Sequence, residues 1–185
     1  MGKTAVPPSG LWSQIASIIN ANFSDPNFGV YDYNDAATAV TPIAVAPATW
    51  VALPNDELGP FTNKTYAHPD VPDVWDSSAG AFDFTSLVLG DTVDIRLDID
   101  LTTTSQNQEF SVSLFVDDGG GGEYEIPFVV EAQYKTAGTR KIEAFNGIYM
   151  GDATTLNGAS RFRVQSDSSC SVVVNGWYCR AMKRV

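Results

Sequence analysis

A strict alternation of apolar and polar side chains over residues 91–116 constrains the fold more than any other feature. Its first half carries an aliphatic residue at every second position, namely Val93, Ile95, Leu97, Ile99 and Leu101. A period of two places all of these side chains on one face of a strand. After a polar turn at residues 103–109 the alternation resumes with Phe110, Val112, Leu114 and Val116. The stretch therefore predicts a β-hairpin with one buried and one solvated face, as in an antiparallel sheet packed on one side.

The chain after residue 80 repeats this pattern, with turn signals about every ten residues. They include Asp117–Glu123, Asn146-Gly147 and Leu156–Gly158. The four glycines of 119–122 are read as a hairpin tip, because no Lys-Ser/Thr follows them as a phosphate-binding loop requires. Asn175-Gly176 is either a tight turn or a glycine kink in one strand. About eight strands and no second helix predict an all-β fold, an antiparallel β-sandwich of the jelly-roll type.

The N-terminal region differs in pattern. Residues 1–10 contain Pro7, Pro8 and Gly10 and are expected to form an extended arm. Residues 11–23 carry the one helical pattern, an apolar stripe made of Leu11, Trp12, Ile15, Ile18, Ile19 and Phe23. A helix of about three turns is marginal alone in water, so it must lie on its own domain or on another protein, and we favour the partner.

These patterns divide the chain into three parts. Residues 1–25 are expected to form the arm and one short α-helix that anchors the protein. Residues 26–48, which are interrupted by Pro26, Pro42 and Pro47, read as a linker with an edge strand. Residues 49–185 form the predicted jelly-roll β-sandwich domain.

Net charge, hydropathy and cysteine content limit the partners, the location and the cross-links that the chain is expected to have. The net charge of −11 repels phosphate backbones and anionic lipids, which argues against nucleic acid and membrane as partners. No apolar run approaches the roughly 20 residues that span a bilayer, and the N-terminus does not fit a signal peptide. We therefore expect synthesis in a cytoplasm. The two cysteines, Cys170 and Cys179, read as free and inert thiols.

Candidate catalytic and metal-binding residues are few. His68 is the only histidine, so sites that need two histidines are excluded. Asp98 and Asp100 share one strand face and could serve as the carboxylate pair of a glycoside hydrolase, but Arg96 stands between them and no apolar wall is evident. Two acidic loop clusters could hold calcium, although neither matches an EF-hand: Asp70, Asp73 and Asp76, and Asp32, Asn34 and Asp35. We expect ordinary loop and surface roles, no cofactor, no metal and no enzymatic activity.

The aromatic and basic residues are instead candidates for contacts with a sugar or with other subunits. Trp50, Trp75, Trp177 and Tyr178 could form a sugar-stacking platform, or they could belong to the core and to subunit contacts, which we favour. Arg161 and Arg163 alternate as Asp94, Asp98 and Asp100 do, and could pair with them across strands or subunits. The residues predicted to form a subunit interface are Arg96, Asp98, Arg161, Arg163, Trp177 and Tyr178.

Several short segments resemble phage virion proteins with a C1q/TNF-like jelly roll. They are Thr49-Trp50, Asn55-Asp56, Phe82–Phe84, Gly90–Arg96, Ile148–Asp152, Arg161–Val164 and Val172–Tyr178. The opening Leu11–Ala16 with Asn20–Phe23 is similar to N-terminal segments of phage structural proteins. The resemblance covers most of the chain. It implies a homotrimer about a three-fold axis, attachment to a capsid or tail, and no catalysis.

The resulting hypothesis is a homotrimeric capsid decoration (cement) protein of a virion, made in the host cytoplasm. Its arm and helix would bind the major capsid protein or another virion protein. The alternative is a receptor- or glycan-binding head or tip of a tail fibre. A glycoside hydrolase that uses Asp98 and Asp100 ranks third.

Overall fold

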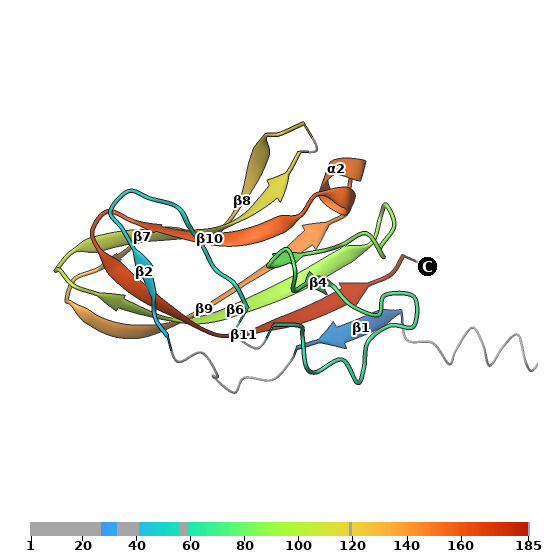
Figure 1. Cartoon of the computed structure of the whole chain (residues 1–185), viewed down its shortest axis with the longest axis horizontal. Coiled ribbons are helices and arrows are strands. Elements are labelled where there is room, and N and C mark those ends of the chain that lie inside the picture. Colours follow the sequence, from blue (N-terminus) through green and yellow to red (C-terminus); the bar gives the residue numbers. More distant parts are fainter. Residues whose placement is uncertain (1–26, 33–40, 56–58, 119, 185) are drawn as a thin grey trace, which may run out of the picture.

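The computed structural model describes residues 27–32, 41–55, 59–118 and 120–184 as two antiparallel β-sheets packed face to face (Figure 1). The predicted arm and helix of residues 1–25 lie outside the described residues. Sheet A has the order β1-β11-β6-β9, with β2 also paired to β11. Its strands are β1 (Phe28–Tyr31), β2 (Ile43–Val45), β6 (Thr92–Thr103), β9 (Gly138–Tyr149) and β11 (Cys170–Met182).

Sheet B has the order β4-β5-β10-β7-β8, with β3 also paired to β10. Its strands are β3 (Val51–Ala52), β4 (Trp75–Asp76), β5 (Ala81–Phe82), β7 (Gln108–Asp117), β8 (Glu123–Tyr134) and β10 (Ser160–Ser166). The predicted all-β sandwich is confirmed. The described part of the chain contains no helix long and apolar enough to cross a membrane.

A single-turn helix, α2 (Ala153–Asn157), interrupts the β pattern, so the expectation of no helix after the N-terminal one is wrong. Asp152 caps α2, because its side chain accepts a hydrogen bond of 2.7 Å from the backbone N–H of Thr155. A helix of this length depends on its cap and its contacts rather than on helix propensity. The segment had been read as a turn.

The two strands of the predicted 91–116 hairpin both exist, but they do not pair with each other. β6 lies in sheet A between β11 and β9, and β7 lies in sheet B between β10 and β8. The polar segment between them crosses from one sheet to the other. Alternation shows which face of a strand is buried. A strand can bury its apolar face against the opposite sheet whichever strand lies beside it, so the alternation does not identify the neighbouring strand.

The described part of residues 26–48 contributes two short strands to the sandwich, where the sequence predicted a linker with one edge strand. β1 and β2 pair with opposite ends of β11, and they bury Tyr31 and Val45 in the core. Strands of three or four residues show too few alternations to be recognised along the chain. Asn175-Gly176 is a kink: β11 runs unbroken through it, with a register shift between Val174 and Gly176.

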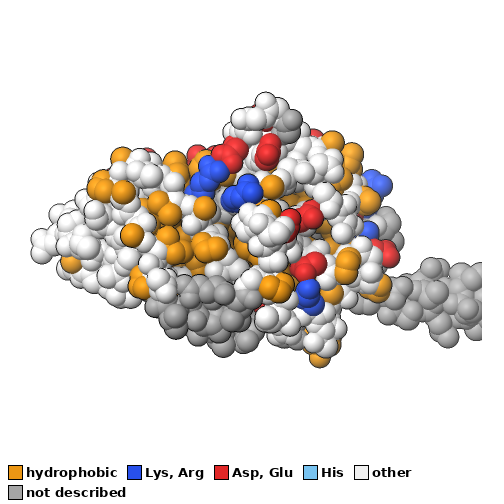
Figure 2. All heavy atoms as spheres, in the orientation of Figure 1, with side chains coloured by type: hydrophobic (Ala, Val, Ile, Leu, Met, Phe, Trp, Pro, Cys, Tyr) orange, Lys and Arg blue, Asp and Glu red, His pale blue; other side chains and the backbone are white. Residues whose placement is uncertain are grey.

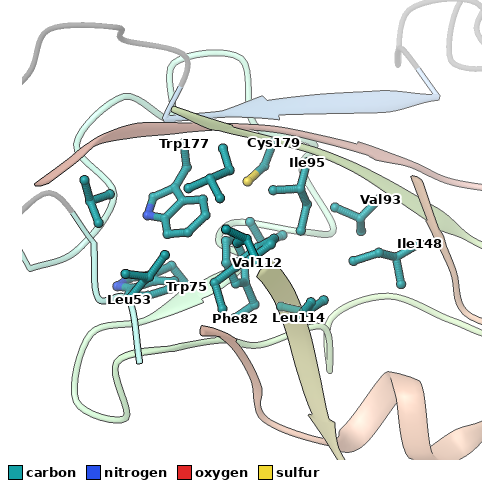
Figure 3. Close-up of a cluster of buried hydrophobic side chains, with 14 of the residues drawn as sticks. Leu53, Trp75, Phe82, Val93, Ile95, Val112, Leu114, Ile148, Trp177 and Cys179 are labelled. Carbon is teal, nitrogen blue, oxygen red and sulfur yellow. The ribbon is translucent and has the colours of Figure 1, made fainter. Parts of the chain in front are cut away.

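The core lies between the sheets, where the inward side chains of β6 and β11 meet those of β7 and β10. Trp177 is 1% exposed, and its ring centroid lies 4.8 Å from that of Phe162 and 5.3 Å from that of Phe82. Figure 3 shows Trp177 and Cys179 pointing toward Trp75, Phe82 and Val112. Both cysteines are free thiols, as predicted, and both are buried. Burial raises the pKa of the Cys179 thiol well above its ordinary value, so the inert neutral form is favoured.

Candidate interaction faces

The outer face of sheet A brings together three of the predicted interface residues. Arg96 donates from Nε to Oδ2 of Asp98 at 3.1 Å, and its Nη2 lies 2.9 Å from the same oxygen. The guanidinium of Arg96 also lies 5.6 Å from the ring centroid of Tyr178 on the neighbouring strand. A second ion pair joins Arg180 to Asp94, with a hydrogen bond of 3.2 Å from Nε to Oδ2. Asp94, Arg96 and Asp98, three of the charges predicted to point away from the core, are therefore paired within the sheet.

Aromatic residues and a methionine lie on this same face. In one cross-strand row, Tyr149 of β9 stands opposite Thr92, which stands opposite Met182, which stands opposite Phe28 of β1. In a parallel row, Phe145 of β9 stands opposite Arg96, which stands opposite Tyr178. Phe145 and Tyr149 are 61% and 63% exposed. We call these two rows, with the ion pairs Asp94–Arg180 and Arg96–Asp98, the sheet A aromatic face.

The outer face of sheet B holds the other two predicted arginines. Arg163 binds the carboxylate of Glu123, with 2.6 Å from Nη1 to Oε2, and its guanidinium lies 4.6 Å from the ring centroid of Phe115. Trp50 packs edge-on against Phe115, with centroids 4.9 Å apart. Arg161 donates to the carbonyl of Ala79 at 3.3 Å. In Figure 2, hydrophobic side chains gather near β2 and β10, with Lys, Arg and acidic side chains between β10 and β8.

The predicted pairing of Arg161 and Arg163 with Asp94, Asp98 and Asp100 is wrong within one chain, because β10 and β6 belong to opposite sheets. Trp177 is also wrong as an interface residue, since it lies in the core. The sugar platform fails for a related reason. Trp75 and Trp177 are buried, and the partly exposed Trp50 and Tyr178 lie on different sheets.

The two candidate catalytic residues, Asp98 and His68, make contacts that stabilise the fold. Asp98 is 2% exposed and is held by Arg96 on a sheet face rather than in a cleft. His68 is buried, and its Nδ1 accepts a hydrogen bond of 3.1 Å from the backbone N–H of Asp70, which stabilises a tight turn. These contacts favour the loop and surface roles expected for both residues.

The acidic loops show the same kind of local bonding. Asp73 accepts hydrogen bonds from the backbone N–H groups of Val74 and Trp75, at 2.8 and 3.1 Å. Asp76 accepts from Ser78, whose bonds hold the pKa of this exposed carboxyl below its ordinary value. Among the residues described, no cluster of three or more His, Cys, Asp or Glu side chains is arranged to hold a metal ion. Asn34 and Asp35 of the other loop lie outside the described residues.

A hollow of about 270 Å³ lies on sheet B near Ala48 and was not expected from sequence. Glu109, Glu131 and Asp167 line it together with Gln165. Glu131 takes a left-handed backbone conformation, with φ of 45°, where the register between β7 and β8 is irregular. A register irregularity of this kind turns side chains away from strict alternation, so such a hollow escapes a pattern search.

The aromatic residues of β9 were also missed, although a signal existed. Ile142, Ala144 and Ile148 point into the core, so period-two alternation places Phe145 and Tyr149 on the outer face. The signal in the sequence is therefore a pair of aromatic residues at positions where the outer face of the strand is otherwise polar. They were overlooked because residues 138–149 had been divided at Asn146-Gly147.

Comparison with solved structures identifies the fold. The chain is similar to VP2 of infectious bursal disease virus in its subviral particle, with a TM-score of 0.51 and 8% identity over 86% of this chain and 34% of that one. The structure of the Gx strain of the same virus gives a TM-score of 0.51 and 8% identity over 86% and 33%. The described chain therefore shares a β-sandwich fold with these viral chains, and it spans about one third of their length.

The CBM22-1 xylan-binding domain of Paenibacillus barcinonensis Xyn10C is also similar, with 14% identity over 81% of this chain and all of that domain. Its TM-score of 0.37 is too low to carry an argument about function. No protein-family model matches the chain. No curated protein matches it either.

Proposed function

We propose that the protein is a non-enzymatic structural component of a virion, a homotrimeric capsid decoration (cement) protein that binds the major capsid protein through residues 1–25. The observation that carries this proposal is the jelly-roll fold, shared over 86% of the chain with a virus particle protein. A shared fold at 8% sequence identity does not establish a shared function, so further support has to come from the composition of the exposed faces.

Those faces have the composition of protein–protein contacts. Aromatic residues, Met and Arg are enriched at interfaces relative to other surfaces. The sheet A aromatic face carries Phe145, Tyr149, Met182, Arg96 and Arg180 on regular strands. A site built on regular strands presents its side chains in fixed positions, which suits a permanent assembly contact. The enclosure of Asp98 by Arg96 further supports a role without catalysis.

The proposal is tested by mixing the purified full-length protein with bare capsids and measuring co-sedimentation. The double variant Ile15→Asp/Ile19→Asp places charge on the predicted apolar stripe of the anchoring helix. The matched control Ser13→Asp/Ser17→Asp places the same charge on its polar side. We expect capsid binding to be lost in the first variant and kept in the second, with a trimer mass by light scattering in both. Equal binding by both variants would reject the anchoring role.

The alternative, a glycan-binding fibre head, has one observation in its favour. Trp50 and Phe115 form an aromatic pair on sheet B beside the charged groups of Arg163 and Glu123. Aromatic faces flanked by hydrogen-bonding groups can hold saccharides. A glycan array probed with wild type and with Trp50→Ala tests this. Saccharide binding that Trp50→Ala abolishes, while Phe145→Ala on the opposite sheet retains it, would favour the fibre head. An array without signal would count against it.

A further inference from the structure

We propose that the sheet A aromatic face is the surface through which copies of this chain meet, with Phe145 and Tyr149 as its anchors. This inference rests on the proposed function, because it assigns the contact that the homotrimer needs. It concerns a second copy of the chain and not the capsid, which residues 1–25 are proposed to bind.

The sheet A aromatic face is exposed on a rigid element. An antiparallel sheet that packs on one side normally presents polar residues on its other side. Here Tyr149, Phe145 and Phe28 are 63%, 61% and 46% exposed on strands whose opposite faces fill the core. Met182 and Tyr178 lie between them and are partly buried. Isolated exposed apolar residues are ordinary, but here they recur on the three strands β9, β11 and β1, with Thr92 and Arg96 of β6 between them, and such a grouping marks a contact surface.

The charge of this face favours a second copy of the chain as its partner. The chain carries a net charge of −11, so two copies repel each other over most of their surface. The sheet A aromatic face is an exception. Its two aspartates and two arginines are paired as Asp94–Arg180 and Arg96–Asp98, which makes its net charge zero. A neighbouring copy can therefore approach this face with less like-charge repulsion than elsewhere and without breaking either ion pair. In a three-fold assembly the three copies turn this face toward the common axis, whereas two such faces stacked directly on each other would give a two-fold dimer.

The outer face of sheet A is also large enough to hold such a contact. β6 contains twelve residues and runs the length of the sheet. At about 3.4 Å per residue and 4.8 Å between strands, three to four strands give a face of about 40 Å by 15–19 Å, or about 600–750 Å². Stable complexes of standard size bury about 800 Å² on each partner. This area is that of the whole outer face of sheet A, and the sheet A aromatic face is its part near Thr92–Asp98, so a contact of standard size includes the neighbouring polar part as well. The far end of the outer face, with Lys141, Glu143 and Asp100, provides a polar rim of the usual kind.

The test uses the full-length protein and measures mass against concentration by sedimentation equilibrium. The double variant Phe145→Thr/Tyr149→Thr removes both anchors and places a residue of high strand propensity at each position, so the fold is retained. The control Val130→Thr replaces an apolar side chain that is 68% exposed on β8 of sheet B. Circular dichroism and thermal unfolding verify that all three proteins are folded.

We expect the double variant to weaken self-association by about 100-fold or more, since truncation of a central aromatic anchor typically has effects of this size. The control should associate as wild type does. Wild-type association should also strengthen as salt rises from about 0.05 to 0.5 M, because salt screens repulsion between the acidic bodies and no ion pair bridges the copies.

If the wild-type protein associates, either of two results would overturn the inference: equal association of the double variant and wild type, or association that salt weakens. The proposed function is judged separately by capsid co-sedimentation. An oligomer that depends on Phe145 and Tyr149 but ignores capsids would retain the interface and reject the cement role. An oligomer that binds capsids and associates equally well with and without both substitutions would retain the cement role and reject the interface. A wild-type monomer at all concentrations would reject the contact between copies.

Discussion

The buried side chain of Gln108 should be one of the strongest individual contributors to stability, because it ties two crossovers together. It lies at the start of β7, 1% exposed. Its Oε1 accepts hydrogen bonds of 3.1–3.4 Å from the segment that joins β6 to β7, at Thr104 N, Ser105 N and Ser105 Oγ. Its Nε2 donates bonds of 2.8–3.2 Å toward the segment that joins β10 to β11, at Ser166 Oγ, Ser168 O and Ser169 O.

The perturbation that isolates these bonds is Gln108→Met, which nearly preserves volume and removes every donor and acceptor of the amide. Thr104 and Ser169 are exposed, so water can replace their lost partners. Ser166 Oγ keeps its hydrogen bond of 2.6 Å to the carbonyl of Glu109, so about two groups, on the half-buried Ser105 and Ser168, lose their partner, and each costs about 1–3 kcal/mol. After a small gain from the apolar methionine, we expect a net loss of about 2–4 kcal/mol. For a domain of this size that corresponds to a fall in Tm of about 4–16 °C.

The assay is urea unfolding followed by tryptophan fluorescence, with Gln133→Met as the matched control. Gln133 is exposed on β8, and its amide donates a single bond of 3.1 Å to Glu109. The control should change stability by less than about 0.5 kcal/mol, as exposed substitutions usually do. If both substitutions lower the unfolding free energy equally, the crossover network does not stabilise the sandwich, and the reasoning is refuted.

Three further predictions concern the edges of the sandwich. Gly29→Ala should destabilise the protein by about 2 kcal/mol or more, because the new Cβ would clash with the backbone nitrogen of His68; unchanged urea stability would contradict this. Asp91→Ala should cost about 2–4 kcal/mol and speed amide exchange at Arg184, whose N–H donates to the fully buried Asp91 carboxylate at 2.7 Å; unaltered exchange would count against it. Burial raises the pKa of Tyr31 from 10.0 to about 12, so it should be among the last of the seven tyrosines to ionise in an ultraviolet titration. The raised pKa favours the neutral phenol in the fold, so its contribution is complete below pH 10 and is lost as pH rises toward about 12, a loss that Tyr31→Phe should remove.

Local alternation determined which side chains point inward. The five aliphatic positions from Val93 to Leu101 are all buried, and so are Phe110, Val112, Leu114 and Val116. Alternation depends only on successive Cβ atoms pointing to opposite faces, so it can be read from a single strand. The same reasoning placed Arg96, Asp98 and Arg163 on outer faces, and it would have placed Phe145 and Tyr149 there had residues 138–149 been taken as one strand.

Tertiary structure alone decided which strands became neighbours. β6 and β7 are consecutive and similar in pattern, yet they lie in opposite sheets, and β11 recruits β1 and β2 from residues that had looked like a linker. The partners of Arg163 and the position of Trp177 in the core follow from that arrangement. Burial of a face is a property of one segment of chain. Pairing is instead a competition among all segments for the same edges, which is resolved only when the two sheets close over a shared core.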